Sequence, residues 1–277
     1  MAKKTARITD LTRDEVESLC RGWIRAKQNG IGESVRGEFS GKLNGRTFDL
    51  DFEGHPRMTY VVESGERIHW AEADGERQSE YAQILELGTK PGLFLINHLR
   101  SETFPLENCT LILDFETHLA TLVLARLGDS RRPRDVERIF YFGYLRDPGK
   151  ALDVQLKHEF TVDLVGKLID WDYGGGFVVK HMYISRDHMV YLLTESFEKE
   201  KGLVEAAECD YIKVRDNVYV VSWLEKGHQG MQGVVLMDLD SMHDVGSFFG
   251  ISVLDTLDNY TFAANGRFTD VWHMTEI

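Results

Sequence analysis

The sequence predicts an all-β protein made of two tandem antiparallel β-barrels that follow an N-terminal helix. Short segments with alternating apolar and polar residues recur along most of the chain, separated by turn residues. The same run of segments is repeated in the two halves, and a helical pattern precedes only the first copy. Each half has about eight to nine strands, and an antiparallel sheet of that size usually closes because closure removes its unpaired edges.

The N-terminal residues 1–35 form a helical extension in this prediction. Thr12 is the expected N-cap, since Glu15 follows at the spacing of a capping box. Apolar residues then recur at the spacing of one helix face, and we expect the helix to end near Asn29-Gly30. These residues are Val16, Leu19, Cys20, Trp23 and Ile24. We expect this helix to cover or brace a sheet rather than to bind a partner.

From Gly41 onward the apolar residues recur every second position, which is typical of strands. Turn residues such as Glu53-Gly54 and Asp74-Gly75 separate the segments. The predicted strands of the first half are Thr47–Phe52, Arg57–Glu63, Arg67–Ala73, Ala82–Leu87, Leu93–Leu99, Thr110–Phe115, Ala120–Arg126 and Arg138–Leu145. The turn at Asp147–Lys150 is the predicted boundary between a first barrel over residues 36–148 and a second over residues 149–277.

Three pairs of segments support an internal duplication. Asn217–Glu225 reads NVYVVSWLE, and the earlier GLFLINHL places Phe94, Ile96 and His98 where the later strand has Tyr219, Val221 and Trp223. Similarly, GKLIDWDYG repeats the pattern of GRTFDLDFEG, and Val235–Asp238 repeats Leu111–Asp114. Spacings that drift by a few residues between pairs are expected where loops differ in length between two copies of one fold.

Composition and motifs exclude several function classes. The 277 residues carry a net charge of −13, so nucleic acid and anionic membranes are poor partners. The three cysteines form no CxxC pair, and the start of the chain has no apolar leader, which favours a reducing cytoplasm. Metal-ligand spacings and phosphate-binding loops are absent from the sequence, so we expect no metal and no cofactor.

The candidate site residues are polar and aromatic side chains on strands that should face a barrel interior. His98 is a titratable group on an apolar face, and is either a satisfied core histidine or a functional group. Asp216 and Glu225 bracket the central strand of the second half, and we expect Glu225 to be a solvated strand-end residue. The catalytic candidates are Asp216, His98, His181 and Tyr191, and the candidate ligand contacts are Tyr60, Trp70, Phe94, Tyr183, Tyr219 and Trp223.

From about residue 36 the chain resembles the two-domain MoaF family. In the first half the resemblance is carried by GRTFDLDFEG, the strand that ends IHW at Trp70, LFLINHL and LILDFETHLATL. In the second half it is carried by EAAECDYIKVRDNVYVVSWLE and GVVLMDLDS. The resemblance implies two calycin barrels, one for each half.

Part of the second half is also similar to phenolic acid decarboxylases, which are single calycin barrels without a cofactor. Tyr219, Ser222, Trp223 and Glu225 match that family, and its proton-handling glutamate falls on Asp216. Its arginine falls near Leu193, and its paired tyrosines fall near Ile169 and Trp171. A phenol clamp and a carboxylate-binding cation are therefore missing from the matched positions.

These observations leave three functions open. The first is a module that binds a small aromatic or apolar molecule inside a barrel. The second is a cofactor-free lyase, decarboxylase or isomerase that uses acid–base residues in such a cavity. The third is an interaction protein with solid, packed barrels. The sequence leaves the oligomeric state open, with a homodimer as one candidate.

Overall fold

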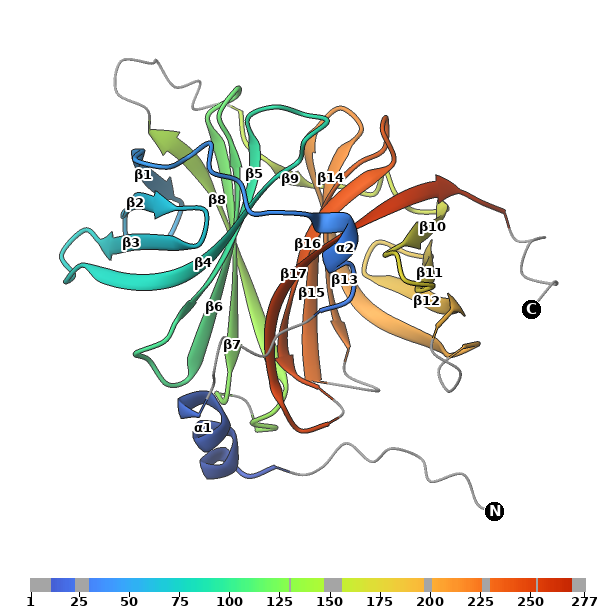
Figure 1. Cartoon of the computed structure of the whole chain (residues 1–277), viewed down its shortest axis with the longest axis horizontal. Coiled ribbons are helices and arrows are strands. Elements are labelled where there is room, and N and C mark those ends of the chain that lie inside the picture. The colour runs from blue at the N-terminus through green and yellow to red at the C-terminus, as the bar shows by residue number, and fades with distance from the viewer. Residues whose placement is uncertain are drawn as a thin grey trace.

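A computed structural model describes residues 11–22, 30–129, 131–146, 156–196, 201–225, 230–252 and 254–270. It confirms the predicted all-β class: two antiparallel barrels lie side by side, with one helix below them and a short helix over their junction (Figure 1). The predicted boundary turn at residues 147–150 lies outside the described residues.

The helices are α1 (Arg13–Arg21) and α2 (Glu33–Arg36). The first barrel consists of β1 (Thr47–Phe52), β2 (Met58–Ser64), β3 (Arg67–Glu72), β4 (Gln78–Glu86), β5 (Leu93–Arg100), β6 (Leu106–Asp114), β7 (Leu119–Leu127) and β8 (Val136–Arg146). The second consists of β10 (Leu168–Asp172), β11 (Val178–Tyr183), β12 (His188–Glu195), β13 (Val204–Arg215), β14 (Val218–Glu225), β15 (Gly230–Asp238), β16 (His243–Ile251) and β17 (Leu257–Phe268). The short strand β9 (Glu159–Phe160) pairs with β13.

Each barrel is a simple meander that closes on itself. In the first, every strand pairs with the next, and β8 returns to β1 with Leu145 opposite Leu50. In the second, β17 returns to β10 with Gly266 opposite Trp171, and β12 pairs with β13. The two barrels thus repeat one strand order, with β5 corresponding to β14.

Helix α1 begins with the predicted capping box: the Thr12 side chain accepts from the Glu15 backbone N–H, and the Glu15 carboxylate accepts from the Thr12 N–H. Val16 is fully buried and packs with Leu99 of the first barrel and Phe249 of the second, so α1 braces both barrels. The positions predicted to continue the helix, Trp23 and Ile24, and its predicted end at Asn29 lie outside the described residues.

Contact between the barrels explains why the central strands are apolar on both faces. In β14, Tyr219, Val221 and Trp223 point into the second barrel, as predicted. Val218 and Val220 point outward, into a cluster shared with β4–β7 of the first barrel. This cluster buries the outer faces of β4–β7 and β13–β17 where the two barrels meet, which stabilises their contact and leaves the interiors free to differ.

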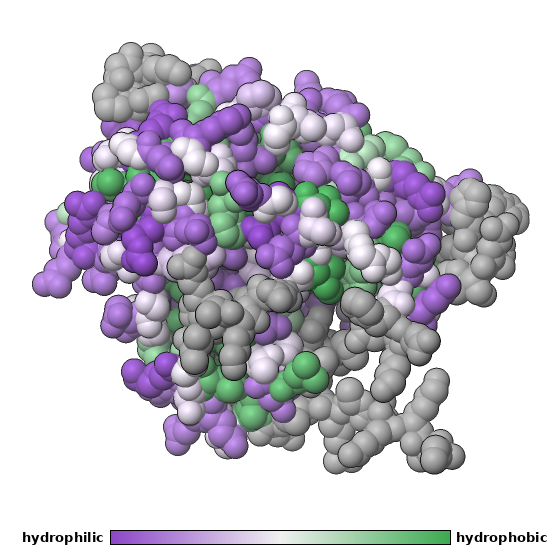
Figure 2. All heavy atoms as spheres, viewed as in Figure 1, coloured by the Kyte–Doolittle hydropathy of each residue, from purple (hydrophilic) through white to green (hydrophobic). Residues whose placement is uncertain are grey.

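The face of the molecule in Figure 2 is mostly polar: hydrophilic side chains cover much of it, and hydrophobic residues form several small, separate groups among them. In the described part of the chain, no helix is long and apolar enough to cross a membrane.

Candidate functional site

The second barrel contains a cavity of about 240 Å³ at one of its ends. The end of β14, the end of β12 and the start of β17 all contribute to its wall, as expected where antiparallel strands alternate in direction. The described lining residues are Ile31, Tyr173, Phe177, Val179, His181, Tyr191, Leu193, Leu203, Trp223, Glu225, Met231, Phe248, Asp258 and Tyr260. The wall is therefore largely aromatic and aliphatic, with a few polar groups, which is the usual character of a small-molecule site.

The segment before α2 helps to close this cavity. Ile31 lines it, and the Gly32 carbonyl accepts a hydrogen bond from the Ala263 N–H of β17 at 3.4 Å. Gly30 lies so close to the Tyr260 ring that an added Cβ would fall 2.0 Å from it. The absence of a side chain at Gly30 thus lets the segment lie directly on the cavity wall.

Trp223 owes its position to another glycine. A Cβ at Gly233, its partner across β14 and β15, would lie 2.2 Å from the Trp223 ring. Phe248 meets the same ring edge-to-face, with ring centroids 5.5 Å apart. The indole is therefore fixed from both sides, as a rigid part of the cavity wall.

His181 lies on the cavity wall and is 3% exposed. Its ring contacts Trp223 edge-to-face at a centroid distance of 5.7 Å, and burial lowers the pKa of the imidazole to about 3. Within the described residues, its Nδ1 atom makes no hydrogen bond. His181 is therefore a neutral imidazole with hydrogen-bonding capacity to spare.

Glu225 is buried rather than solvated, so the expectation from its strand-end position is wrong. It is 6% exposed, lines the cavity, and accepts a hydrogen bond from the Trp223 indole N–H at 3.0 Å. The end of β14 is covered because the barrel wall continues past it: Met231 of β15, which pairs with Glu225, also lines the cavity.

The other polar groups of the cavity are phenols and a second carboxyl group. The Tyr191 hydroxyl donates to Glu205 at 2.5 Å, and burial, together with the nearby Glu225 charge, raises the pKa of Tyr191. Burial and the neighbouring Asp258 charge raise the pKa of Tyr260 in the same way. Burial also raises the pKa of Asp258, which accepts a hydrogen bond from the Thr256 hydroxyl at 3.2 Å.

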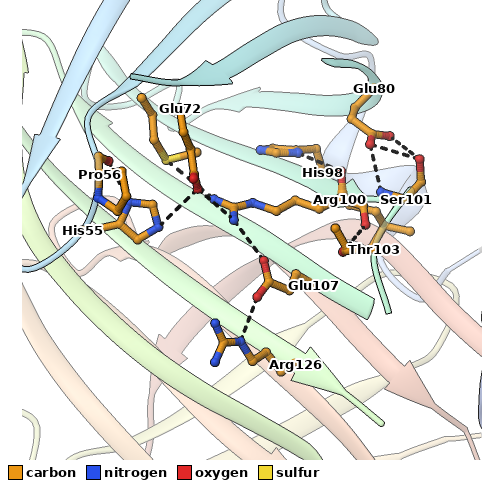
Figure 3. Close-up of polar contacts among 12 residues, drawn as sticks. His55, Pro56, Glu72, Glu80, His98, Arg100, Ser101, Thr103, Glu107 and Arg126 are labelled. Carbon is orange, nitrogen blue, oxygen red and sulfur yellow. Dashed lines mark hydrogen bonds and ion pairs between the residues drawn. The ribbon is translucent and has the colours of Figure 1, made fainter. Parts of the chain in front are cut away.

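The corresponding end of the first barrel is filled by an ion-pair network. Arg100 ends β5 as Glu225 ends β14, and its guanidinium lies 4.7 Å from the centre of the Trp70 ring. Figure 3 shows Arg100 between Glu72 and Glu107, at 3.1 and 3.0 Å. The two barrels thus carry opposite charges at the same position.

His98 is a satisfied core histidine. Its Nδ1–H donates to the Leu99 carbonyl at 3.0 Å, so Nε2 is left to accept from the Tyr60 hydroxyl at 3.0 Å. Trp70 and Phe94, the other predicted ligand contacts of the first barrel, belong to the same packed interior. These four residues lie together, but apart from the cavity of the second barrel.

Asp216 does not belong to the cavity, so the structure does not bring this predicted catalytic residue together with His181 and Tyr191. Its side chain is 99% exposed in the turn between β13 and β14, where Lys213 pairs with it at 3.3 Å. Glu225 lies at the other end of β14, roughly 30 Å away at the rise of an extended chain. A carboxylate at that distance cannot reach a molecule in the cavity.

Two predicted ligand contacts lie in the second barrel but outside the cavity wall. Tyr219 is near the opposite end, where its hydroxyl donates to Asp163 at 3.2 Å. Tyr183 packs edge-to-face against His181 and Tyr211 within the core. Of the predicted site residues, the structure brings His181, Tyr191 and Trp223 together at the cavity.

Sequence reasoning missed Asp258, Tyr260 and Phe248, because the last two strands were not traced. Extending the repeat would have placed Tyr260 on the counterpart of the RIFYFGYL strand. Of the described residues, no group of three or more His, Cys, Asp or Glu side chains is positioned to hold a metal ion.

Comparison with known proteins gives consistent matches over both halves. Family models described as MoaF N-terminal domain and MoaF C-terminal domain match residues 25–129 and 158–271. The protein MoaF of Klebsiella aerogenes is 25% identical over 246 residues, which are 82% of this chain and 86% of that protein. A solved crystal structure from Burkholderia vietnamiensis, described as a proposed beta-lactamase, is 18% identical, with a TM-score of 0.32 over 39% of this chain and 97% of that one.

Proposed function

The chain belongs to the MoaF family, and within this two-domain arrangement we propose that the C-terminal barrel binds a small aromatic or apolar molecule, with the N-terminal barrel as its packed support. The cavity of about 240 Å³ carries this proposal. Its rings are fixed by their neighbours before any ligand arrives, so little ordering would be needed on binding. In the first barrel the residue that corresponds to Glu225 is Arg100, and two carboxylates of that barrel already pair with it.

Acid–base catalysis in the same cavity is the second candidate, and it is less well supported. A general acid or base works best when its pKa lies near the operating pH. Burial lowers the pKa of His181 to about 3, and it raises those of the phenols Tyr191 and Tyr260 above their ordinary value. Asp258 differs from these groups, because burial raises the pKa of its carboxyl group above its ordinary value. Asp258 is therefore the residue to replace once a substrate is known.

The binding proposal is tested by titrating the full chain with three small aromatic probes, namely benzyl alcohol, benzylamine and phenylacetate, by calorimetry. A variant that fills the cavity, Val179→Phe, should lose at least about tenfold in affinity for any probe that binds, equivalent to about 1.4 kcal/mol. Val179 lies on the cavity wall and is 6% exposed. The matched control is Val204→Phe, since Val204 is 57% exposed on the outside of the same barrel.

The two variants distinguish binding in the cavity from binding elsewhere on the protein. Binding that Val179→Phe abolishes and Val204→Phe preserves would support a ligand in the cavity. Binding that both variants preserve would place the probe elsewhere, and the proposal would then fail.

A further inference from the structure

The charges around the cavity in the second barrel point to a particular class of ligand. Two carboxyl groups, Glu225 and Asp258, line it, and none of its described lining residues is Lys or Arg. A third carboxylate, Glu205, lies just behind the Tyr191 hydroxyl that donates to it. A ligand that carried a carboxylate would meet like charges in a buried setting, which is strongly unfavourable.

The aromatic wall favours the same sign of charge. Trp223, Phe248, Tyr260, Tyr191 and Tyr173 all contribute to it. The faces of aromatic rings carry partial negative charge, and cations surrounded by several rings are bound through it. Rings and carboxyl groups together form a site that attracts a cation and repels an anion.

His181 supplies an independent observation, because it carries a buried polar atom that lacks a hydrogen-bond partner. His181 is 3% exposed and lines the cavity, and its Nδ1 atom has no hydrogen-bond partner among the described residues. A buried polar atom without a partner destabilises the folded protein, and a ligand N–H that bonded to Nδ1 could relieve that penalty. As a neutral imidazole it can accept such a hydrogen bond without opposing a positive charge.

We propose that the ligand of this cavity is a small primary amine in its ammonium form, with its nitrogen near Glu225, Asp258 and His181 and its apolar part against Trp223 and Phe248. This inference rests on the binding function proposed above and narrows it to a ligand class. The first barrel offers the contrast: Arg100 stands where Glu225 stands, and its charge is matched by Glu72 and Glu107 of the same barrel.

The test compares three probes of similar size and different charge at neutral pH. Benzylamine should bind at least about tenfold more tightly than benzyl alcohol, and phenylacetate should bind most weakly, a tenfold ratio being about 1.4 kcal/mol. Glu225→Gln and Asp258→Asn should each weaken benzylamine about tenfold while changing benzyl alcohol less than twofold. Both amides can still accept the hydrogen bonds that Trp223 and Thr256 donate, so the fold should be kept.

The outcomes distinguish failure of the proposed ligand class from failure of the proposed binding function. If benzyl alcohol or phenylacetate matches benzylamine, and Val179→Phe removes that binding, the ammonium class is wrong while the binding function stands. If Glu225→Gln and Asp258→Asn weaken all three probes alike, the carboxylates do not recognise charge, and the ammonium class is again wrong. If none of the three probes binds, the binding function fails, and the ligand class fails with it.

Discussion

The guanidinium of Arg215, in the second barrel, holds the carboxylate of Asp114, in the first, through two hydrogen bonds of 2.5 and 2.7 Å. A second ion pair joins the barrels with the charges reversed: Lys90 of the first barrel lies 3.7 Å from Asp238 of the second. Arg215 ends β13 and Lys90 follows the corresponding strand β4, while Asp114 and Asp238 end the corresponding strands β6 and β15. The two barrels therefore face each other through the same surface, as two subunits do across a twofold axis.

Arg215→Ala should destabilise the protein by about 3 kcal/mol or more, because it leaves a fully buried carboxylate unpaired. Lys90→Ala is the matched control and should cost less than about 1 kcal/mol, since Lys90 is 26% exposed and its closer partner is the exposed Asp240. Urea unfolding of the two variants gives both values. Equal losses would mean that burial of Asp114 does not decide the strength of this contact.

The same contact between barrels shows what the sequence could and could not predict. Alternation in β14 and its echo in β5 predicted which side chains face inward, and Tyr219, Val221 and Trp223 do so. Alternation alone gave no reason for Val218 and Val220 to be apolar as well. The structure supplies the reason, because those residues pack on the first barrel. The residue pattern of a single strand does not reveal which distant part of the chain packs on its outer face.

The candidate site was predictable only in part, for a physical reason that Glu225 and Asp216 illustrate. Both are carboxylates at the ends of one strand, and the sequence favoured Asp216 through its match to a decarboxylase. Burial depends on whether the neighbouring strands extend past the residue, and β15 covers Glu225 while Asp216 lies in an open turn. Residues such as Asp258, which reach the cavity from a distant strand, are brought there only by barrel closure.

The buried histidines should make the protein sensitive to acid, and His98 is the clearest case. Burial lowers the pKa of His98 to about 4 in the folded state, compared with 6.5 ordinarily. Between these values the unfolded chain binds a proton that the folded chain does not, so stability should fall as the pH falls from about 6.5 to about 4. A shift of this size corresponds to about 3 kcal/mol.

His98→Gln should reduce the slope of unfolding free energy against pH in this range by the contribution of about one proton, because glutamine does not titrate. Denaturant unfolding at a series of pH values between 4 and 7 measures the slope for both proteins. His188→Gln is the control, since His188 lies at the exposed start of β12. An unchanged slope in His98→Gln would show that His98 does not contribute to the acid sensitivity.

Asp244 should have the opposite pH dependence. Its side chain is fully buried, one oxygen accepts from the Ala264 N–H at 2.8 Å, and the other has no partner in the described part of the chain. Burial raises its pKa well above 3.8, so the folded state holds a proton that the unfolded state has lost, and stability falls as the pH rises through this range.

Asp244→Asn should therefore gain stability relative to the natural protein as the pH rises from 5 to 8, by up to about 1.4 kcal/mol for each pH unit in which only the folded natural protein holds the proton. Asparagine keeps the acceptor for Ala264 and carries no charge. Asp244→Ala loses that acceptor and should be less stable than Asp244→Asn. Thermal unfolding at pH 5 and pH 8 measures the effect, and a gain that is equally large at both values would rule out ionisation as its cause.

Gly233 is the position where a single methyl group should reveal how strictly the cavity wall is fixed. A Cβ there would lie 2.2 Å from the Trp223 ring, so the indole of Gly233→Ala must move toward the cavity or its neighbours. Overpacking of this kind costs about 1–3 kcal/mol of stability. Because Trp223 also holds Glu225 through its N–H, displacement of the ring should weaken benzylamine at least about tenfold, which is about 1.4 kcal/mol.

Gly88→Ala is the matched control, since no heavy atom lies within 4 Å of the added Cβ. It should change neither stability nor binding by more than about 0.5 kcal/mol, as is usual for a surface position. Urea unfolding and calorimetric titration on the same samples give both quantities. If Gly233→Ala loses stability but binds benzylamine normally, the ligand does not contact Trp223, because a ring displaced by the methyl group could not preserve the contact.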